Sequence, residues 1–81
     1  MNEATLKPRK ARPFYARHPW VLDSAIERVT GSPADGDVID VLSNKGKFIA
    51  RGLFNSLSRI RVRLYSWDPN EALDEAFWRR R

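Results

Sequence analysis

The 81-residue chain contains no cysteine, and this absence excludes several kinds of protein at once. Without a thiol the chain can form no disulfide scaffold, no thiolate zinc site and no cysteine nucleophile. The same absence fits the reducing cytoplasm, where disulfides rarely form. We therefore expect a cytoplasmic domain whose stability comes from its apolar core.

Long apolar stretches are also lacking. No run of residues approaches the ~20 that a transmembrane helix requires, and the first residues lack the apolar segment of a signal peptide. Pro8, Pro13 and Pro19 interrupt the basic N-terminal region, so it cannot form a long amphipathic helix on a membrane surface. We expect a protein with no membrane partner.

Residues suited to catalysis are scarce. His18 is the single histidine, so a metal site would have to combine it with carboxylates. Asp35, Asp37 and Asp40 surround a turn and a strand, where turn formation accounts for them more simply than metal binding. Ser24 is close to His18 only in sequence, and the four glycines lack the spacing of a phosphate-binding loop. The sequence therefore predicts no catalytic residue, metal or cofactor in this chain.

The net charge of +5 is concentrated in two parts of the chain. Residues 1–18 contain five basic side chains and one acidic, and residues 59–67 contain three arginines and no acidic residue. Residues 19–58 and 68–81 each carry a net charge of −1. If folding brings the two basic parts together, they form one positive patch, and its natural partner is a polyanion.

Residues 59–64 alternate arginine with isoleucine, valine and leucine, a pattern typical of a β-strand. The apolar side chains would enter a core, while the arginines would share the outer face and repel one another. Such a row offers planar donors that match phosphate oxygens. Basic residues on an exposed strand also discourage edge-to-edge aggregation, so both interpretations stay open.

Turn signals divide the chain into short segments. We expect a loose start at Met1–Lys7 and one or two helical turns at Pro13–His18, anchored to the core by Phe14 and Tyr15. Extended segments and strands are expected at residues 20–22, 25–29, 37–42, 48–54 and 59–67. Gly52 indicates a bulge or a close backbone approach. The spacing of the strands favours a mainly β fold, a small barrel or sandwich with short helices.

The C-terminal residues differ in character. Asp68 is a helix-capping residue type, followed by a proline and by an acidic residue three positions later, so we expect a helix from there. Phe77 and Trp78 would be large apolar groups with few local partners on that helix. We expect residues 1–67 to form the domain and residues 68–81 to form a linker helix leading to a second domain.

A second notable cluster runs from Arg17 to Trp20. Trp20 is expected to anchor the core. Arg17 and His18 would lie at the rim of a groove, where they can contact a phosphate or stack on a base, and a structural role for His18 also stays open. The basic run before them is either a solvated tail or a source of contacts to an RNA backbone, and comprises Lys7, Arg9, Lys10 and Arg12.

A set of motifs spread over nearly the whole chain resembles one protein family. These motifs are Arg17-His18-Pro19-Trp20-Val21, Ala25-Ile26, Gly36-Asp37-Val38, Phe48-Ile49-Ala50-Arg51-Gly52, Asn55, Ile60-Arg61-Val62-Arg63 and Asp74-Glu75-Ala76-Phe77. Together they resemble the N-terminal PUA domain of the S-adenosylmethionine-dependent methyltransferases that modify cytosine C5 in large-subunit ribosomal RNA. The His-Pro-Trp-Val element with the later pattern is the specific part, because Gly-Asp-Val alone occurs in many small barrels.

The resemblance implies a PUA-like pseudo-barrel of about six strands with a short helix near the N-terminus, followed by the start of a C-terminal helix. It also implies binding of structured RNA in a groove of the first helix and adjacent strands, near Arg12, Arg17 and His18. In such enzymes the S-adenosylmethionine site and the catalytic cysteine belong to a following Rossmann-like domain. Since the chain stops at Arg81, we expect it to be no enzyme alone and to hold no cofactor.

Two functions are consistent with these features. The leading hypothesis is an RNA-binding module that brings a methyltransferase to ribosomal RNA. Its candidate RNA-binding residues are Arg9, Lys10, Arg12, Arg17, His18, Arg61 and Arg63. The alternative is an interdomain scaffold that packs on the downstream methyltransferase domain through Phe77 and Trp78, with Arg61 or Arg63 paired to acids of that domain.

Overall fold

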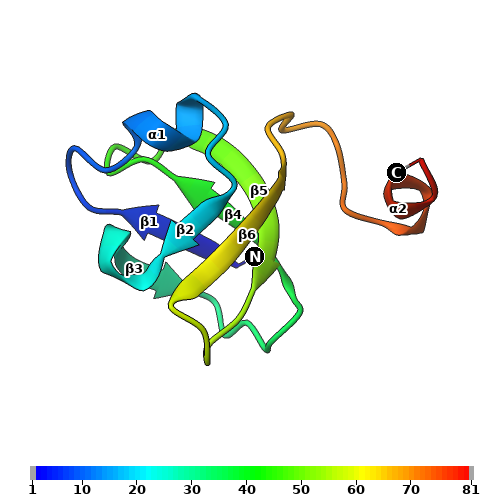
Figure 1. Ribbon diagram of the computed structural model, residues 1–81, viewed down its shortest axis with the longest axis horizontal. Helices are drawn as coiled ribbons and strands as arrows, with labels where there is room; N and C mark the ends of the chain where they lie inside the picture. Colours follow the sequence, from blue (N-terminus) through cyan, green and yellow to red (C-terminus); the bar gives the residue numbers. More distant parts are fainter. Residues whose placement is uncertain (1, 81) are drawn as a thin grey trace.

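Six short strands form one sheet that curls into a half-barrel in the computed structural model, which describes residues 2–80 (Figure 1). The strands are β1 (Glu3–Leu6), β2 (Trp20–Leu22), β3 (Ile26–Thr30), β4 (Val38–Leu42), β5 (Phe48–Phe54) and β6 (Ile60–Ser66). The helices are α1 (Arg12–Tyr15) and α2 (Glu75–Arg79), with a 3-10 turn, η1, at Asp23–Ala25. The predicted mainly β barrel-like fold with short helices is confirmed.

The order of the strands explains why the sheet curls. Hydrogen-bonded neighbours follow the order β2-β6-β5-β4-β1-β3, and all pairs are antiparallel except β1 with β4. The two edge strands, β2 and β3, are joined only by the three residues of η1. This short connection holds the two edges close together, so the sheet must bend around a single core.

Alternate side chains of the strands fill this core. Val62 and Leu64 of β6 are buried, while Arg63 between them is exposed, as the alternating pattern predicts. The largest side chains with no appreciable exposure are Leu6, Val21, Ile39, Val41 and Val62. The core therefore lies inside the curl and leaves the outer faces of the strands available for other roles.

The expected loose start at Met1–Lys7 is wrong for residues 2–7, the described part of that segment. β1 pairs with β3 on one side and β4 on the other, and Ala4 and Leu6 have no solvent exposure. A strand of four residues is too short to display a readable alternation of apolar and polar side chains. Its stability comes from neighbours on both sides, which the local sequence does not reveal.

Gly52 of β5 confirms the predicted close approach of two backbones. A Cβ atom at this position would lie 2.0 Å from the carbonyl oxygen of Arg63 on β6. The pairing register of β5 with β6 also shifts between Arg51 and Gly52, which marks a local irregularity of the ladder. Only a residue without a side chain fits between the two strands here.

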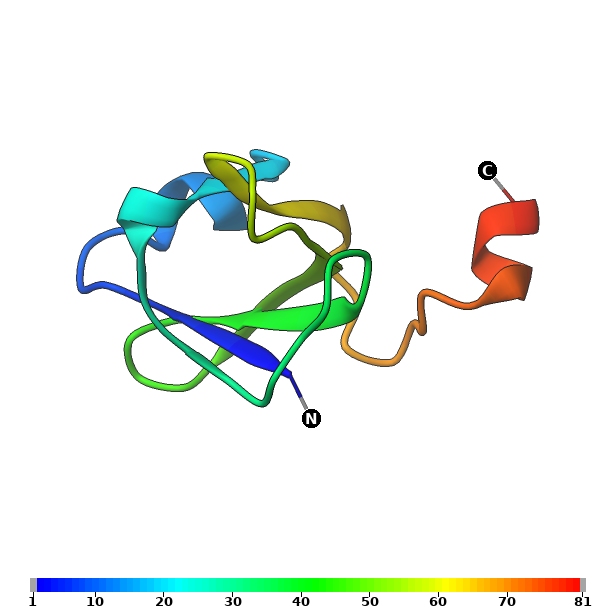
Figure 2. The same ribbon diagram turned by 90° about the horizontal axis from the view of Figure 1, so that it is seen from below.

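The C-terminal helix begins later than the sequence predicts. Asp74 is the N-cap of α2, and its Oδ1 accepts a hydrogen bond from the Phe77 amide at 2.9 Å. Asp68 instead accepts a bond from the Asn70 amide and closes a turn. The ribbon of α2 stands apart from the half-barrel in both views (Figures 1 and 2). Within residues 2–80, no helix combines the length and apolar character needed to cross a membrane.

The two large apolar residues of α2 differ in exposure. Phe77 is only 2% exposed, so the expectation that it has few local partners is wrong. Trp78 is 39% exposed, and its ring makes an edge-on contact with Tyr65 of β6 at a centroid distance of 5.0 Å. The interdomain role expected for both residues stays a prediction, and of the two only Trp78 presents a substantial surface.

Candidate nucleic-acid interface

α1 lies across one end of the half-barrel and is anchored there by Phe14 (Figure 1). The Phe14 side chain is buried in the core, as predicted, and its carbonyl oxygen accepts a 2.7 Å hydrogen bond from the indole Nε1 of Trp67. Tyr15, expected as a second anchor, is 54% exposed. Trp20 is 48% exposed and not a core anchor, because Val21 is the inward-facing residue of β2.

One cleft beside α1 is strongly basic, and we name it the cationic cleft. It has a volume of about 460 Å³ and is lined by Arg9, Ala11, Arg12, Tyr15, Ser43, Asn44, Lys45 and Lys47. The lining thus contains four cations and no carboxylate. Within residues 2–80, none of these four cations forms an ion pair. Their charges are available to an anion.

A second, smaller hollow of about 280 Å³ lies near α1 and β2 and is mainly apolar. It is lined by Lys10, Pro13, Phe14, His18, Trp20, Leu22, Ser24 and Ala25. The His18 ring stands edge-on to Phe14 and Trp20, at centroid distances of 6.0 and 6.4 Å. Its Nδ1 accepts a hydrogen bond from the Trp20 amide at 3.3 Å. These contacts fit a structural role for His18, and its predicted role in RNA binding stays a prediction.

Arg17 follows α1 and faces a third cleft. Its guanidinium carbon lies 5.4 Å from the centre of the Trp67 ring, which is the geometry of a cation–π contact. This cleft, of about 470 Å³, also includes Asp68 and Glu71. The two carboxylates make it less suitable for a phosphate than the cationic cleft.

Arg61 and Arg63 lie away from these clefts. Arg61 pairs with Asp23 at 3.4 Å, so a residue outside the 59–67 segment supplies its counter-charge. Arg63 lines a separate cleft of about 350 Å³ together with Asp35 and the exposed Leu57. A hydrogen bond from the Ser56 amide lowers the pKa of Asp35, which keeps an acid ionised in that cleft.

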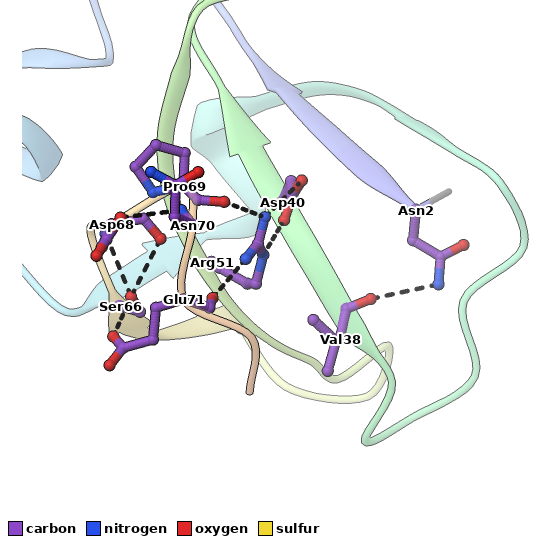
Figure 3. A network of polar contacts seen from close by, with 9 residues as sticks. All are labelled: Asn2, Val38, Asp40, Arg51, Ser66, Asp68, Pro69, Asn70 and Glu71. Atoms are coloured by element: carbon purple, nitrogen blue, oxygen red, sulfur yellow. Dashed lines mark hydrogen bonds and ion pairs between the residues drawn. The ribbon is translucent and has the colours of Figure 1, made fainter. Parts of the chain in front are cut away.

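A half-buried arginine ties the C-terminal segment to the sheet (Figure 3). Arg51 of β5 donates from Nε to Asp40 Oδ1 at 2.6 Å and from its other nitrogens to the carbonyl oxygens of Pro69 and Glu71. Ser66 donates to the Glu71 carboxylate at 2.6 Å. The hydrogen bond with Asp40 raises the pKa of Arg51. The carbonyl oxygens of Pro69 and Glu71 accept these hydrogen bonds from Arg51, so the segment after β6 turns along the sheet. The helix begins only at Glu75.

The predicted RNA-binding residues therefore fall into separate groups. Arg9 and Arg12 share the cationic cleft, Lys10 and His18 share the apolar hollow, and Arg17 lies on Trp67. Their roles in binding stay predictions. Sequence reasoning missed Lys45 and Lys47, which the β4–β5 hairpin places beside α1. The signal was two lysines in a five-residue loop, but nothing local shows what that loop faces.

The fold and these clefts define a class of protein, a small β half-barrel module with a basic end around its short first helix. Residues 4–67 match the protein-family model for the PUA-like domain, so the chain belongs to the PUA-like domain family. The PUA-like domain that the motifs predicted is thereby confirmed.

Three similar proteins are each named ribosomal RNA large subunit methyltransferase I. The chain is 45% identical over 65 residues to that of Cronobacter sakazakii and 43% identical over 65 residues to that of Aeromonas salmonicida, covering 80% of this chain and 16% of each relative. It is 37% identical over 76 residues to that of Shewanella amazonensis, covering 94% of this chain and 19% of the relative. The chain thus spans less than a fifth of the curated relatives it matches.

Proposed function

We propose that this PUA-like domain binds structured RNA through the end of the half-barrel that carries α1. The observation that supports this most directly is the cationic cleft, where four basic side chains lie together without a carboxylate. Exposed Tyr15 and Trp20 lie on the same end and offer flat surfaces on which bases can stack. RNA-binding surfaces commonly combine cations that bind phosphates with aromatic side chains on which bases stack.

We further propose that the RNA is ribosomal and that the domain is the N-terminal part of a cytoplasmic large-subunit methyltransferase acting on cytosine C5. The names of the relatives support the ribosomal target. Within residues 2–80, the only parallel strand pair, β1 with β4, is not joined by a single crossover helix as in a nucleotide-binding fold. We therefore assign S-adenosylmethionine and methyl transfer to the rest of the longer protein.

The proposal is tested by titrating a fluorescently labelled fragment of large-subunit ribosomal RNA with the protein at two salt concentrations. Binding should weaken steeply as salt rises, because phosphate contacts release counterions. The double substitution Arg9→Ala/Arg12→Ala, at two residues of the cationic cleft, should weaken binding. It should also lower the slope of log affinity against log salt by about one unit for each phosphate contact that is lost. Absence of binding at low salt would refute the proposal.

A control must remove the same charge elsewhere. Arg28 and Arg79 suit this purpose, since each side chain is largely exposed and paired with a neighbouring glutamate. Arg28→Ala/Arg79→Ala should leave RNA binding nearly unchanged. If both double variants bind equally weakly, overall charge and not the α1 end determines the affinity.

The second candidate function is an interdomain scaffold. The observation that favours it is Trp78 of α2, whose ring is partly exposed although one side of it contacts Tyr65 of β6. In this case the remainder of the longer protein, supplied as a separate domain, should shift the NMR signals of residues 73–80. The two functions are compatible, because they use different ends of the domain.

A further inference from the structure

We propose that the β4–β5 hairpin, residues 43–47, is a second RNA-phosphate-binding element, with Lys45 and Lys47 facing Arg9 and Arg12 across the cationic cleft. The inference rests on the proposed RNA binding and adds an element that the basic N-terminal region alone does not include. The two walls of the cleft come from residues 9–15 and residues 43–47, which are distant in sequence, and only the fold brings them together.

The hairpin holds its lysines at defined backbone positions. Ser43 is buried, and its hydroxyl oxygen accepts hydrogen bonds from the backbone amides of Lys45 and Lys47, both at 3.2 Å. The Ser43 amide donates to the Lys47 carbonyl at 2.8 Å, and its own carbonyl accepts from the Gly46 amide at 2.9 Å. The backbone amides of Ser43, Lys45, Gly46 and Lys47 are thus engaged within the loop, and the two ammonium groups are the charged parts of the hairpin that reach an anion.

The opposite wall carries backbone strain at Arg9. Arg9 has a φ of 69°, a left-handed conformation that disfavours any residue with a side chain. Glycine would adopt it without that cost. The Arg9 side chain is exposed and forms no ion pair with another described residue, so folding does not require the arginine. Strained backbone conformations cluster at functional sites, and binding of phosphate would explain why an arginine occupies this position.

Charge repulsion supports the same interpretation. Four cations around one open cleft repel each other when it is empty, and their positive potential attracts a chain of phosphates. A single small anion can neutralise part of this charge, but an RNA backbone offers successive phosphates to both walls. Arg9 and Arg12 can bind in the bidentate mode of guanidinium, while Lys45 and Lys47 act as point charges.

The test compares the salt dependence of RNA binding in three proteins: the unchanged chain, Lys45→Ala/Lys47→Ala and the control Arg28→Ala/Arg79→Ala. The probe is a fluorescently labelled RNA stem–loop from large-subunit ribosomal RNA. The hairpin variant should lower the slope of log affinity against log salt by about 2, one unit for each lysine. The control should keep the slope of the unchanged chain.

Each outcome decides a different question. If the unchanged chain binds RNA and the hairpin variant shows the same slope, the hairpin is no phosphate-binding element, and the proposed function stands. If the control loses as much slope as the hairpin variant, the hairpin inference is likewise overturned. If the unchanged chain binds no RNA at low salt, the proposed function and this inference both fail.

Arg9→Gly gives an independent test that unfolding cannot mimic. The variant should melt a few degrees higher than the unchanged chain, because glycine relieves the left-handed strain. At the same time, the slope of log RNA affinity against log salt should fall by about one unit. If the variant melts at a higher temperature and the slope of log affinity against log salt is unchanged, Arg9 does not bind phosphate.

Discussion

At Gly52 the backbones of β5 and β6 come so close that no side chain fits between them. The position illustrates how one residue can control the pairing of two strands. Gly52→Ala should destabilise the domain by about 3 kcal/mol, because the new methyl group overlaps the Arg63 carbonyl and one backbone must move. Urea unfolding followed by tryptophan fluorescence measures this loss.

Gly46 provides the matched control for that substitution. A Cβ atom there would meet no other atom within 4 Å, but the residue has a φ of 84°. Gly46→Ala should therefore cost only about 1 kcal/mol, the energy of the left-handed conformation. Equal losses for the two variants would show that loss of glycine flexibility, and not the close approach to β6, explains the effect at Gly52.

Single residues also show where sequence reasoning succeeds and fails. The burial of Phe14 and the close approach at Gly52 could be predicted, because each follows from a local pattern. The exposure of Trp20 could not, since a large aromatic residue is usually a core residue. Its direction depends on Val21 occupying the inward side of β2, a matter of register that the neighbouring strand decides.

At the scale of elements, the segment after β6 is fixed by Arg51 and not by helix formation (Figure 3). Arg51→Ala would leave the largely buried Asp40 carboxylate without its cation and two carbonyls without a donor. We expect a loss of about 3 kcal/mol in unfolding free energy, as for other buried ion pairs broken from one side. Urea unfolding measures it, and hydrogen exchange should show faster exchange of the Glu71 amide.

A second variant separates the two tasks of Arg51. Asp40→Asn removes the ion pair but keeps the arginine and its bonds to the carbonyls of Pro69 and Glu71. It should destabilise the domain while leaving hydrogen exchange in residues 68–71 slow relative to Arg51→Ala. Fast exchange of that segment in both variants would mean that Asp40, and not the carbonyl contacts, holds it in place.

The elements that the sequence failed to predict have a common cause. β1 and the turn at residues 68–71 are both defined by distant partners, β3 and β4 in one case and Arg51 in the other. The longer strands β4, β5 and β6 carry enough alternating or apolar residues to be recognised locally. The local sequence pattern thus predicts the longer strands, whereas contacts with distant residues determine the structure of β1 and of the turn at residues 68–71.

At the scale of the whole molecule, folding divides the positive charge in a way that summing charges along the chain does not predict. The two basic parts, residues 1–18 and 59–67, do not merge into one patch. Arg9 and Arg12 instead share a cleft with the lysines of the β4–β5 hairpin. Arg61 pairs with Asp23, and Arg63 shares a cleft with Asp35. An RNA ligand would accordingly contact one end of the half-barrel and not the outer face of β6.

NMR chemical-shift mapping with an RNA stem–loop tests this division directly. The amide signals of residues 9–20 and 43–47 should move on titration, because these segments line the cationic cleft and the apolar hollow. The signals of residues 59–63 should stay in place, since their cations face carboxylates or lie on another side. Shifts concentrated in residues 59–63 would instead make the arginine strand the RNA-binding surface and leave the cationic cleft without its proposed ligand.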